Sequence, residues 1–188
     1  MTSTASEQIR WTTADLELFP DDGKRYEIID GELFVTRAPH WKHQTACVKV
    51  GTQLEIWSNE TGLGQVAFAP GIIFNDTDNV IPDVVWVSNQ RLSEILDEAG
   101  HLIGAPELVI EVLSPGEVQK KRDKQLKLKL YSVQGVQEYW IFDREKETVG
   151  IYRRENGVLK LAATLYKEDN LTSSLLPGFS CAVKVCFS

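Results

Sequence analysis

The apolar run over residues 108–113 is the clearest element in the chain, and one charged residue, Glu111, stands inside it. Apolar side chains on both faces are typical of a central strand in a sheet that is covered on both sides. A carboxylate there is costly unless it is paired, hydrogen-bonded or bound to a metal ion. One interpretation is a strand-end glutamate that reaches water or a lysine of the next helix. We favour a functional role, because buried carboxylates in clefts are enriched at active sites.

A second apolar strand begins directly after Pro82 and Asp83. Proline makes the entry of this strand extended, and the aspartate is then expected at the sheet edge where Glu111 lies. Alone, Asp83 would be an ordinary turn residue. Two carboxylates at one edge can hold Mg²⁺, which activates water and clamps a phosphate group. With an ammonium group nearby, the pair predicts phosphodiester hydrolysis.

The ammonium group is expected on the lysine-rich helix that follows the break at 114–116 and ends near residue 133. At about 100° per residue, Asp123, Lys127 and Tyr131 fall on one side of this helix. Lys127 lies beside the apolar stripe, so its stem can cover apolar surface while its ammonium reaches a polar cleft. Asp123 and Tyr131 either orient Lys127 or are ordinary surface residues. Two other lysines on the same side of the helix could supply the ammonium in place of Lys127: Lys120 and Lys124. The apolar stripe that we expect to be buried consists of Leu126, Leu130 and Val133.

An amphipathic helix is predicted over 39–60, because apolar positions recur there at the spacing of one helical face. His43 lies near the start of that face, where a core or capping histidine is more common than a histidine of a functional site. The members of the face are His43, Cys47, Val50, Leu54 and Trp57.

The other elements predict an α/β fold with a mixed sheet and helices packed on it. Asp30 and Gly31 are a strong signal for a two-residue hairpin turn, because a type I′ turn needs positive φ at both central residues. The remaining expected elements are short helices over 11–20 and 90–99 and strands over 65–74, 80–87, 138–143, 148–153, 158–165 and 181–187.

The net charge of the chain argues against a protein that coats nucleic acid without sequence preference. Twenty basic and 27 acidic residues give a net charge of −7, which repels a polyanion on average. Residues 117–131 are net positive although the chain is net negative, because this segment has six basic and two acidic side chains. A solvated helix face is the ordinary explanation for most of these lysines.

The three cysteines and the absence of an apolar leader indicate a cytoplasmic protein with no membrane segment. Their number is odd and their spacing does not fit a zinc site. Cys181 and Cys186 are expected on opposite faces of the last strand. We therefore expect inert core cysteines in a reducing compartment.

Six short motifs follow one another between about residues 11 and 153. They are Tyr26-Glu-Ile-Ile-Asp-Gly-Glu-Leu, His43-Gln44, Pro82-Asp83-Val, Ala105-Pro-Glu-Leu-Val-Ile-Glu-Val-Leu-Ser-Pro115, Asp123-x₃-Lys127-x₃-Tyr131 and Gly135-Val-x-Glu-Tyr-Trp-Ile-x-Asp143. Each motif is weak alone. Their combination resembles the Uma-type family of bacterial endonucleases, a group of unknown function within the PD-(D/E)XK restriction-endonuclease-like superfamily.

The length of 188 residues and the lack of an interdomain linker predict a single domain over 1–188. The resemblance implies that this domain has a restriction-endonuclease-like core of mixed β-sheet flanked by helices, with additional β-hairpins. In this family pattern Asp83 matches the metal-binding aspartate and Glu111 the second acidic ligand. Leu113 occupies the position where the superfamily motif has lysine, so the resemblance suggests that Lys127 supplies the ammonium. Glu32 and His43 match family positions near the site.

The resulting prediction is a metal-dependent endodeoxyribonuclease, a hydrolase that cuts DNA with Mg²⁺, or with Mn²⁺ as the alternative cofactor. The competing prediction is a catalytically silent binding or interaction module that keeps the same fold. A homodimer is expected, because cutting two strands favours two-fold pairing and the chain contains aromatic strands over 139–142 and 151–152.

Overall fold

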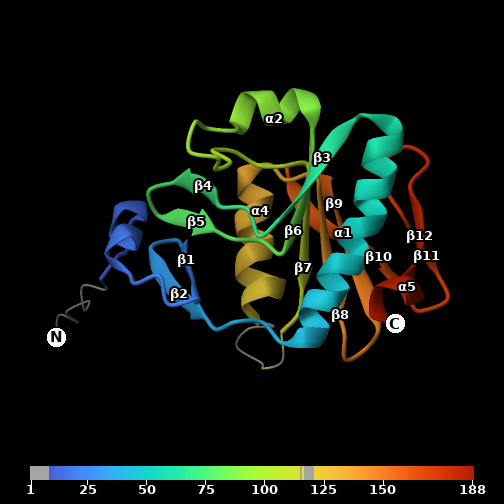
Figure 1. Cartoon of the computed structure of the whole chain (residues 1–188), viewed down its shortest axis with the longest axis horizontal. Helices are drawn as coiled ribbons and strands as arrows, with labels where there is room; N and C mark the ends of the chain where they lie inside the picture. The colour runs from blue at the N-terminus through green and yellow to red at the C-terminus, as the bar shows by residue number, and fades with distance from the viewer. Residues whose placement is uncertain (1–8, 115, 117–120) are drawn as a thin grey trace.

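A six-stranded mixed sheet, in the order β10-β9-β8-β7-β6-β3, organises the fold (Figure 1). The computed structural model describes residues 9–114, 116 and 121–188. Strand β7 runs parallel to β8 and antiparallel to β6, and the other neighbouring pairs in this sheet are antiparallel. The strands are β3 (Gly64–Phe68), β6 (Val84–Ser88), β7 (Leu108–Val112), β8 (Glu138–Asp143), β9 (Thr148–Glu155) and β10 (Val158–Leu165).

A smaller sheet of order β2-β1-β5-β4 packs beside the first, and it consists of β1 (Arg25–Ile29), β2 (Glu32–Thr36), β4 (Ile72–Asn75) and β5 (Asp78–Val80). The predicted hairpin is confirmed: β1 pairs with β2, and the turn residues Asp30 and Gly31 have φ of 51° and 72°. The single strands predicted over 65–74 and 80–87 are wrong, because each segment is divided between the two sheets. Ala69, with φ of 49°, and Pro82, which lacks an N–H for pairing, lie at the two breaks.

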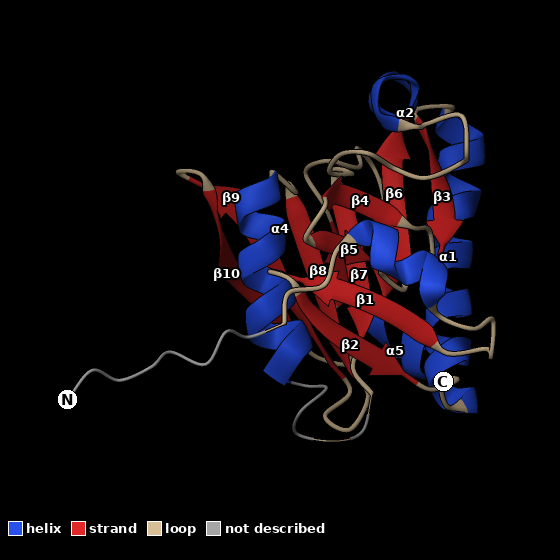
Figure 2. Ribbon diagram, turned by 90° about the vertical axis from the view of Figure 1, so that its left-hand side faces the viewer, coloured by secondary structure: helices blue, strands red, loops and turns tan. Residues whose placement is uncertain are grey.

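Helices and the small sheet cover the two faces of the large sheet (Figure 2). One face packs against α1 (Trp41–Thr61), α5 (Val183–Phe187) and the hairpin of β11 (Asn170–Thr172) and β12 (Ser180–Ala182). The other packs against α2 (Asn89–Ile95), α4 (Leu128–Gln134) and the small sheet. In β7, Ile110 and Val112 join the first core and Val109 joins the second, so the strand is buried on both sides as predicted.

The long helix confirms its predicted apolar face, since His43, Cys47, Val50, Leu54 and Trp57 are all buried. The side chain of His40 accepts a hydrogen bond from the backbone N–H of Lys42 at the start of α1, and Gly62 ends the helix with φ of 67°. A short 3₁₀ helix, η1 (Thr13–Leu18), replaces the first predicted helix. Among the described residues, no helix has the length and apolar character needed to cross a bilayer.

Two sequence predictions near the C-terminal half are corrected. The expected buried stripe of the lysine-rich helix is wrong in part: Leu130 is buried as predicted, but Leu126 is 40% and Val133 is 72% exposed. Asp123 and Lys127 are buried on a π-helical turn, η2 (Arg122–Lys127), and Tyr131 is buried on α4, which follows it directly. The final strand is also wrong: β12 ends at Ala182 and α5 follows at once.

Candidate active site

The sheet register brings Asp83 and Glu111 to the same edge. Val84 on β6 pairs with Ile110 on the antiparallel β7, so Asp83, one residue before Val84, stands across from Glu111. The backbone N–H of Val112 donates to Asp83 Oδ2 at 2.9 Å. Both carboxylates line one cavity of about 30 Å³, which is room for about one or two water molecules or a single ion.

Asp83 is held as a carboxylate by three donors. In addition to Val112 N–H, His43 Nε2 lies 3.1 Å from Oδ2 and Arg25 lies 3.0 Å from Oδ1. Burial by itself would raise the pKa of Asp83, but the hydrogen bonds from His43 and from the backbone N–H of Val112 outweigh it and lower this pKa to about 2. His43 therefore orients the carboxylate of Asp83, in addition to packing in the core.

Glu111 lies opposite the lysine predicted for it. Lys127 Nζ is 2.7 Å from Glu111 Oε1, and the hydroxyl of Tyr131 donates to the same oxygen at 3.2 Å. Burial raises the pKa of Glu111 well above its ordinary value, and the pull of Lys127 does not reverse this, because Asp83, Asp123 and other carboxylates repel a further negative charge. Lys127 stays an ammonium, since its acidic neighbours raise its pKa despite complete burial.

Glu27 on β1 is a site residue that sequence reasoning missed. Its Oε1 lies 2.8 Å from Lys127 Nζ and accepts from the backbone N–H of Ile81 at 2.9 Å, while Oε2 lies 3.5 Å from Arg122. Burial opposes ionisation, but Lys127 and Arg122 leave the pKa of Glu27 below its ordinary value. The structure does not bring Glu32 to this cavity: it is exposed on β2, on the other strand of the same hairpin.

The π-helical turn adds Asp123 and Arg122 to the wall of the cavity. Arg122 Nε lies 3.0 Å from Asp123 Oδ1, and the hydroxyl of Tyr139 donates to the backbone carbonyl of Asp123 at 3.0 Å. A π turn contains more residues than an α turn, so a step of four residues from Asp123 to Lys127 returns closer to the same side of the helix. Burial raises the pKa of Asp123.

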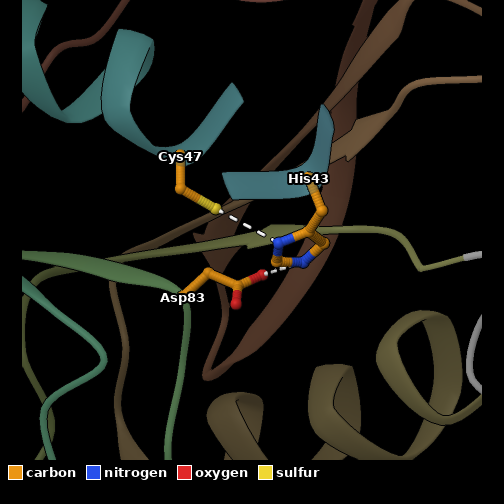
Figure 3. A group of neighbouring side chains, drawn as sticks. All are labelled: His43, Cys47 and Asp83. Carbon is orange, nitrogen blue, oxygen red and sulfur yellow. Dashed lines mark hydrogen bonds and ion pairs between the residues drawn. The ribbon is translucent and has the colours of Figure 1, made fainter. Parts of the chain in front are cut away.

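His43 also contacts Cys47, and Figure 3 shows how these two side chains and Asp83 lie together. Candidate ligand atoms of the three residues lie within 4.8 Å of one another. However, Cys47 Sγ contacts Nδ1 of the imidazole at 3.6 Å, whereas Asp83 contacts Nε2. The two ring nitrogens point in different directions, so this arrangement is a hydrogen-bonded chain that orients Asp83 and does not form a shared centre for one ion. Burial raises the pKa of the Cys47 thiol, which keeps it protonated.

Three arginines line the same cavity, and sequence reasoning identified none of them: Arg25, Arg37 and Arg122. The first two come from the β1–β2 hairpin and its exit, far in sequence from the other site residues, so no local pattern could have marked them. Of the two alternative lysines, Lys124 lies 3.3 Å from Asp143 and lines a different surface hollow. Lys120 lies outside the described residues.

Among the described residues, four carboxylates and four lysine or arginine side chains line this cavity. The carboxylates of Glu27, Asp83, Glu111 and Asp123 offer hard oxygen ligands, which suit a divalent cation such as Mg²⁺. The guanidinium groups suit a phosphate group. The arrangement therefore has the chemical parts needed for metal-assisted attack on a phosphate ester.

Comparison with known proteins agrees with this geometry. The chain is similar to a solved structure described as "Crystal structure of a putative nuclease belonging to DUF820 from Anabaena variabilis ATCC 29413", with 20% sequence identity, a TM-score of 0.75, and coverage of 94% of this chain and 97% of that one. This similarity confirms the predicted fold class. No curated protein matches the chain. A family model does match, over residues 13–184, and the chain therefore belongs to the Uma2 family, whose description is "Putative restriction endonuclease".

Proposed function

We propose that this chain hydrolyses phosphodiester bonds of DNA with a bound divalent cation, Mg²⁺ or alternatively Mn²⁺. One observation carries the proposal: Asp83, Glu111 and Lys127, which come from three elements far apart in the sequence, meet in one buried cavity. The family's description as restriction endonucleases supports a nuclease class of activity. The substrate and the cation are our inference from the chemistry of the residues.

The donor set fits the cation. Asp83 and Glu111 would hold it, with Glu27 or Asp123 as a further oxygen ligand, because carboxylates are the ligands that Mg²⁺ prefers. Burial and three neighbouring carboxylates raise the pKa of Glu111, and a divalent ion bound beside it would favour its ionised form. When bound, the cation would lower the pKa of a water molecule and polarise the phosphate.

The residues of the chain would carry out the rest of the reaction. His43 and the backbone N–H of Val112 fix the carboxylate of Asp83, so that its oxygens do not have to reorganise during the reaction. Lys127 would place its ammonium near the developing charge on the attacked phosphate. Arg25 and Arg37, at the wall of the cavity, would orient the phosphates of the strand.

A cleavage assay tests the proposal. The wild-type chain should cut supercoiled, linear or single-stranded DNA when Mg²⁺ or Mn²⁺ is added, and the activity should disappear with a chelator. Asp83→Asn and Glu111→Gln should abolish cutting. Glu27→Gln should reduce it strongly, whereas Glu32→Gln, on the neighbouring strand of the hairpin, should leave it unchanged. A folded wild type that binds DNA but cuts none of the three forms would favour the silent binding module.

Lys127 has its own matched control on the same helix. Loss of a charged donor that acts on the transition state costs on the order of 10²–10³ in rate, so Lys127→Ala should fall in that range. Lys129→Ala, at an exposed position two residues away, should cut like wild type. Circular dichroism must show that both variants are folded at the assay temperature. Equal rates for the two variants would show that Lys127 is not the catalytic ammonium.

The homodimer remains a proposal, but one of its two sequence arguments is lost. The aromatic residues over 139–142 lie on β8, which is central in the large sheet and fully buried. They therefore cannot form a surface between two copies. What still supports pairing is the need to cut two strands of a duplex. Light scattering at high concentration tests it, and a clean monomer mass would refute it.

A further inference from the structure

Two buried thiols lie against each other at the C-terminal end of the chain, and neither lines the carboxylate cavity. Cys181 Sγ is 3.9 Å from Cys186 Sγ, and the two side chains are 4% and 1% exposed. The chain reverses sharply between them, because β12 ends at Ala182 and α5 begins at the next residue. This reversal overturns the expectation that the two cysteines point to opposite faces of one strand.

We propose that Cys181 and Cys186 form an oxidation-sensitive pair that a peroxide converts into an intramolecular disulfide. The sulfurs are already in contact at 3.9 Å, and a disulfide bond of about 2.0 Å needs a further approach of roughly 2 Å. The pair is held in place from both sides. β12 is paired with β11, where Leu171 stands opposite Cys181, and α5 is packed in the same core as α1.

A surface hollow reaches one member of this pair. Cys186 forms part of the wall of a surface hollow of about 410 Å³, which Trp41, Arg144 and Phe187 also line. The hollow is far larger than one peroxide molecule, whose size is close to that of two waters. The hydrogen bond between the two thiols lowers the pKa of Cys181 and raises that of Cys186, so Cys181 is the member that more readily gives the thiolate, the form that reacts with peroxide.

The reaction balances with hydrogen peroxide as the only co-reactant. One thiol attacks a peroxide oxygen, the O–O bond breaks, and the products are a sulfenic acid and one water. The second thiol then attacks the sulfenic sulfur, the S–O bond breaks, and the hydroxyl leaves as a second water with the thiol's proton. Two sulfurs together lose two electrons, and one peroxide is reduced to two waters.

Cys47 provides an internal control in the same molecule. It is equally buried, but its sulfur contacts His43 and its pKa is raised by burial and by nearby carboxylates. It should therefore stay a thiol under conditions that oxidise the pair. If peroxide oxidised all buried cysteines alike, Cys47 would be oxidised together with Cys181 and Cys186.

Peptide mapping of the intact, folded chain tests the proposal. After treatment with hydrogen peroxide, the chain is denatured, free thiols are blocked with N-ethylmaleimide, and trypsin is added. Trypsin cuts after Lys184, between the two cysteines, so a disulfide joins two separate peptides until a reductant is added. We expect this cross-linked pair in most of the chains, with Cys47 blocked by the maleimide. Maleimide on all three cysteines, or links to Cys47 or between molecules, would overturn the proposal.

Single variants give a second, independent measurement. In Cys181→Ser or Cys186→Ser, the remaining thiol has no partner and should stop at the sulfenic acid, which dimedone traps. The wild-type chain should trap several-fold less dimedone than the variants. Equal trapping in the wild type would also overturn the proposal. If either variant fails to fold, the peptide map of the wild type decides the question by itself.

Discussion

Replacing Lys127 with methionine would reveal how strongly the buried ion pairs support the fold. The Lys127 ammonium is 2.8 Å from Glu27 and 2.7 Å from Glu111, and the side chain is only 1% exposed. Methionine keeps most of the volume but removes the charge, so Glu111 loses its cationic partner and Glu27 keeps only Arg122, at 3.5 Å. Breaking a buried pair in this way costs about 3–5 kcal/mol. That is a large part of the total of about 5–15 kcal/mol that stabilises a domain.

Urea denaturation without divalent cations, followed by circular dichroism, measures this loss. Lys129→Ala should change the free energy of unfolding by no more than about 0.5 kcal/mol, as is usual for an exposed position. The double variant Lys127→Met with Glu111→Gln should recover part of the loss, with a coupling energy of about 0.5–3 kcal/mol. The reasoning is refuted if Lys127→Met costs no more than Lys129→Ala, or if the double variant shows no coupling.

Three further predictions concern the scaffold, and thermal or urea unfolding measures each of them. Gly31→Val should cost about 1–2 kcal/mol, because φ at this hairpin turn is 72° and a β-branched residue is strained there. Gly64→Ala should cost about 1–3 kcal/mol, because the added Cβ would lie 2.4 Å from the backbone oxygen of Val87, which is fixed by strand pairing. Leu54→Ala, at a position with no exposure in α1, should cost about 2–5 kcal/mol. A cost below about 0.5 kcal/mol at any of the three would contradict the packing or backbone argument for that position.

The sequence pattern predicts correctly those elements that are determined by residues close together in the chain. The Asp30–Gly31 turn needs positive φ at two neighbouring residues, and the face of α1 follows from helical spacing alone. Glu111 was conspicuous because a carboxylate inside an apolar strand is rare. In each of these cases, the energetic reason lies within a few residues of the feature.

Features whose cause is distant in the sequence could not be predicted in this way. Glu27 sits in a short strand that has nothing unusual until Lys127 is placed against it. Apolar spacing predicts the burial of Leu130 on the lysine-rich helix, but it does not reveal which other side of that helix faces the cavity. Carboxylates on the sheet stabilise the buried Lys127, which leaves Leu126 and Val133 towards solvent. Splitting of the strands near Ala69 and Pro82 likewise depends on the second sheet.

The mixed direction of the strands around β7 has a consequence for the order of folding. The carboxyl end of β7 meets the beginning of the antiparallel β6 at one edge, and the lysine-rich helix and the β1 hairpin must then close over both. Contacts between segments so far apart form late, because loop closure must come first. Partly folded chains would therefore lack the cavity, and a cation that binds there would stabilise only the complete fold, by about 2.7 kcal/mol at a hundred times its Kd. Such a cation would bias newly made chains towards the finished structure.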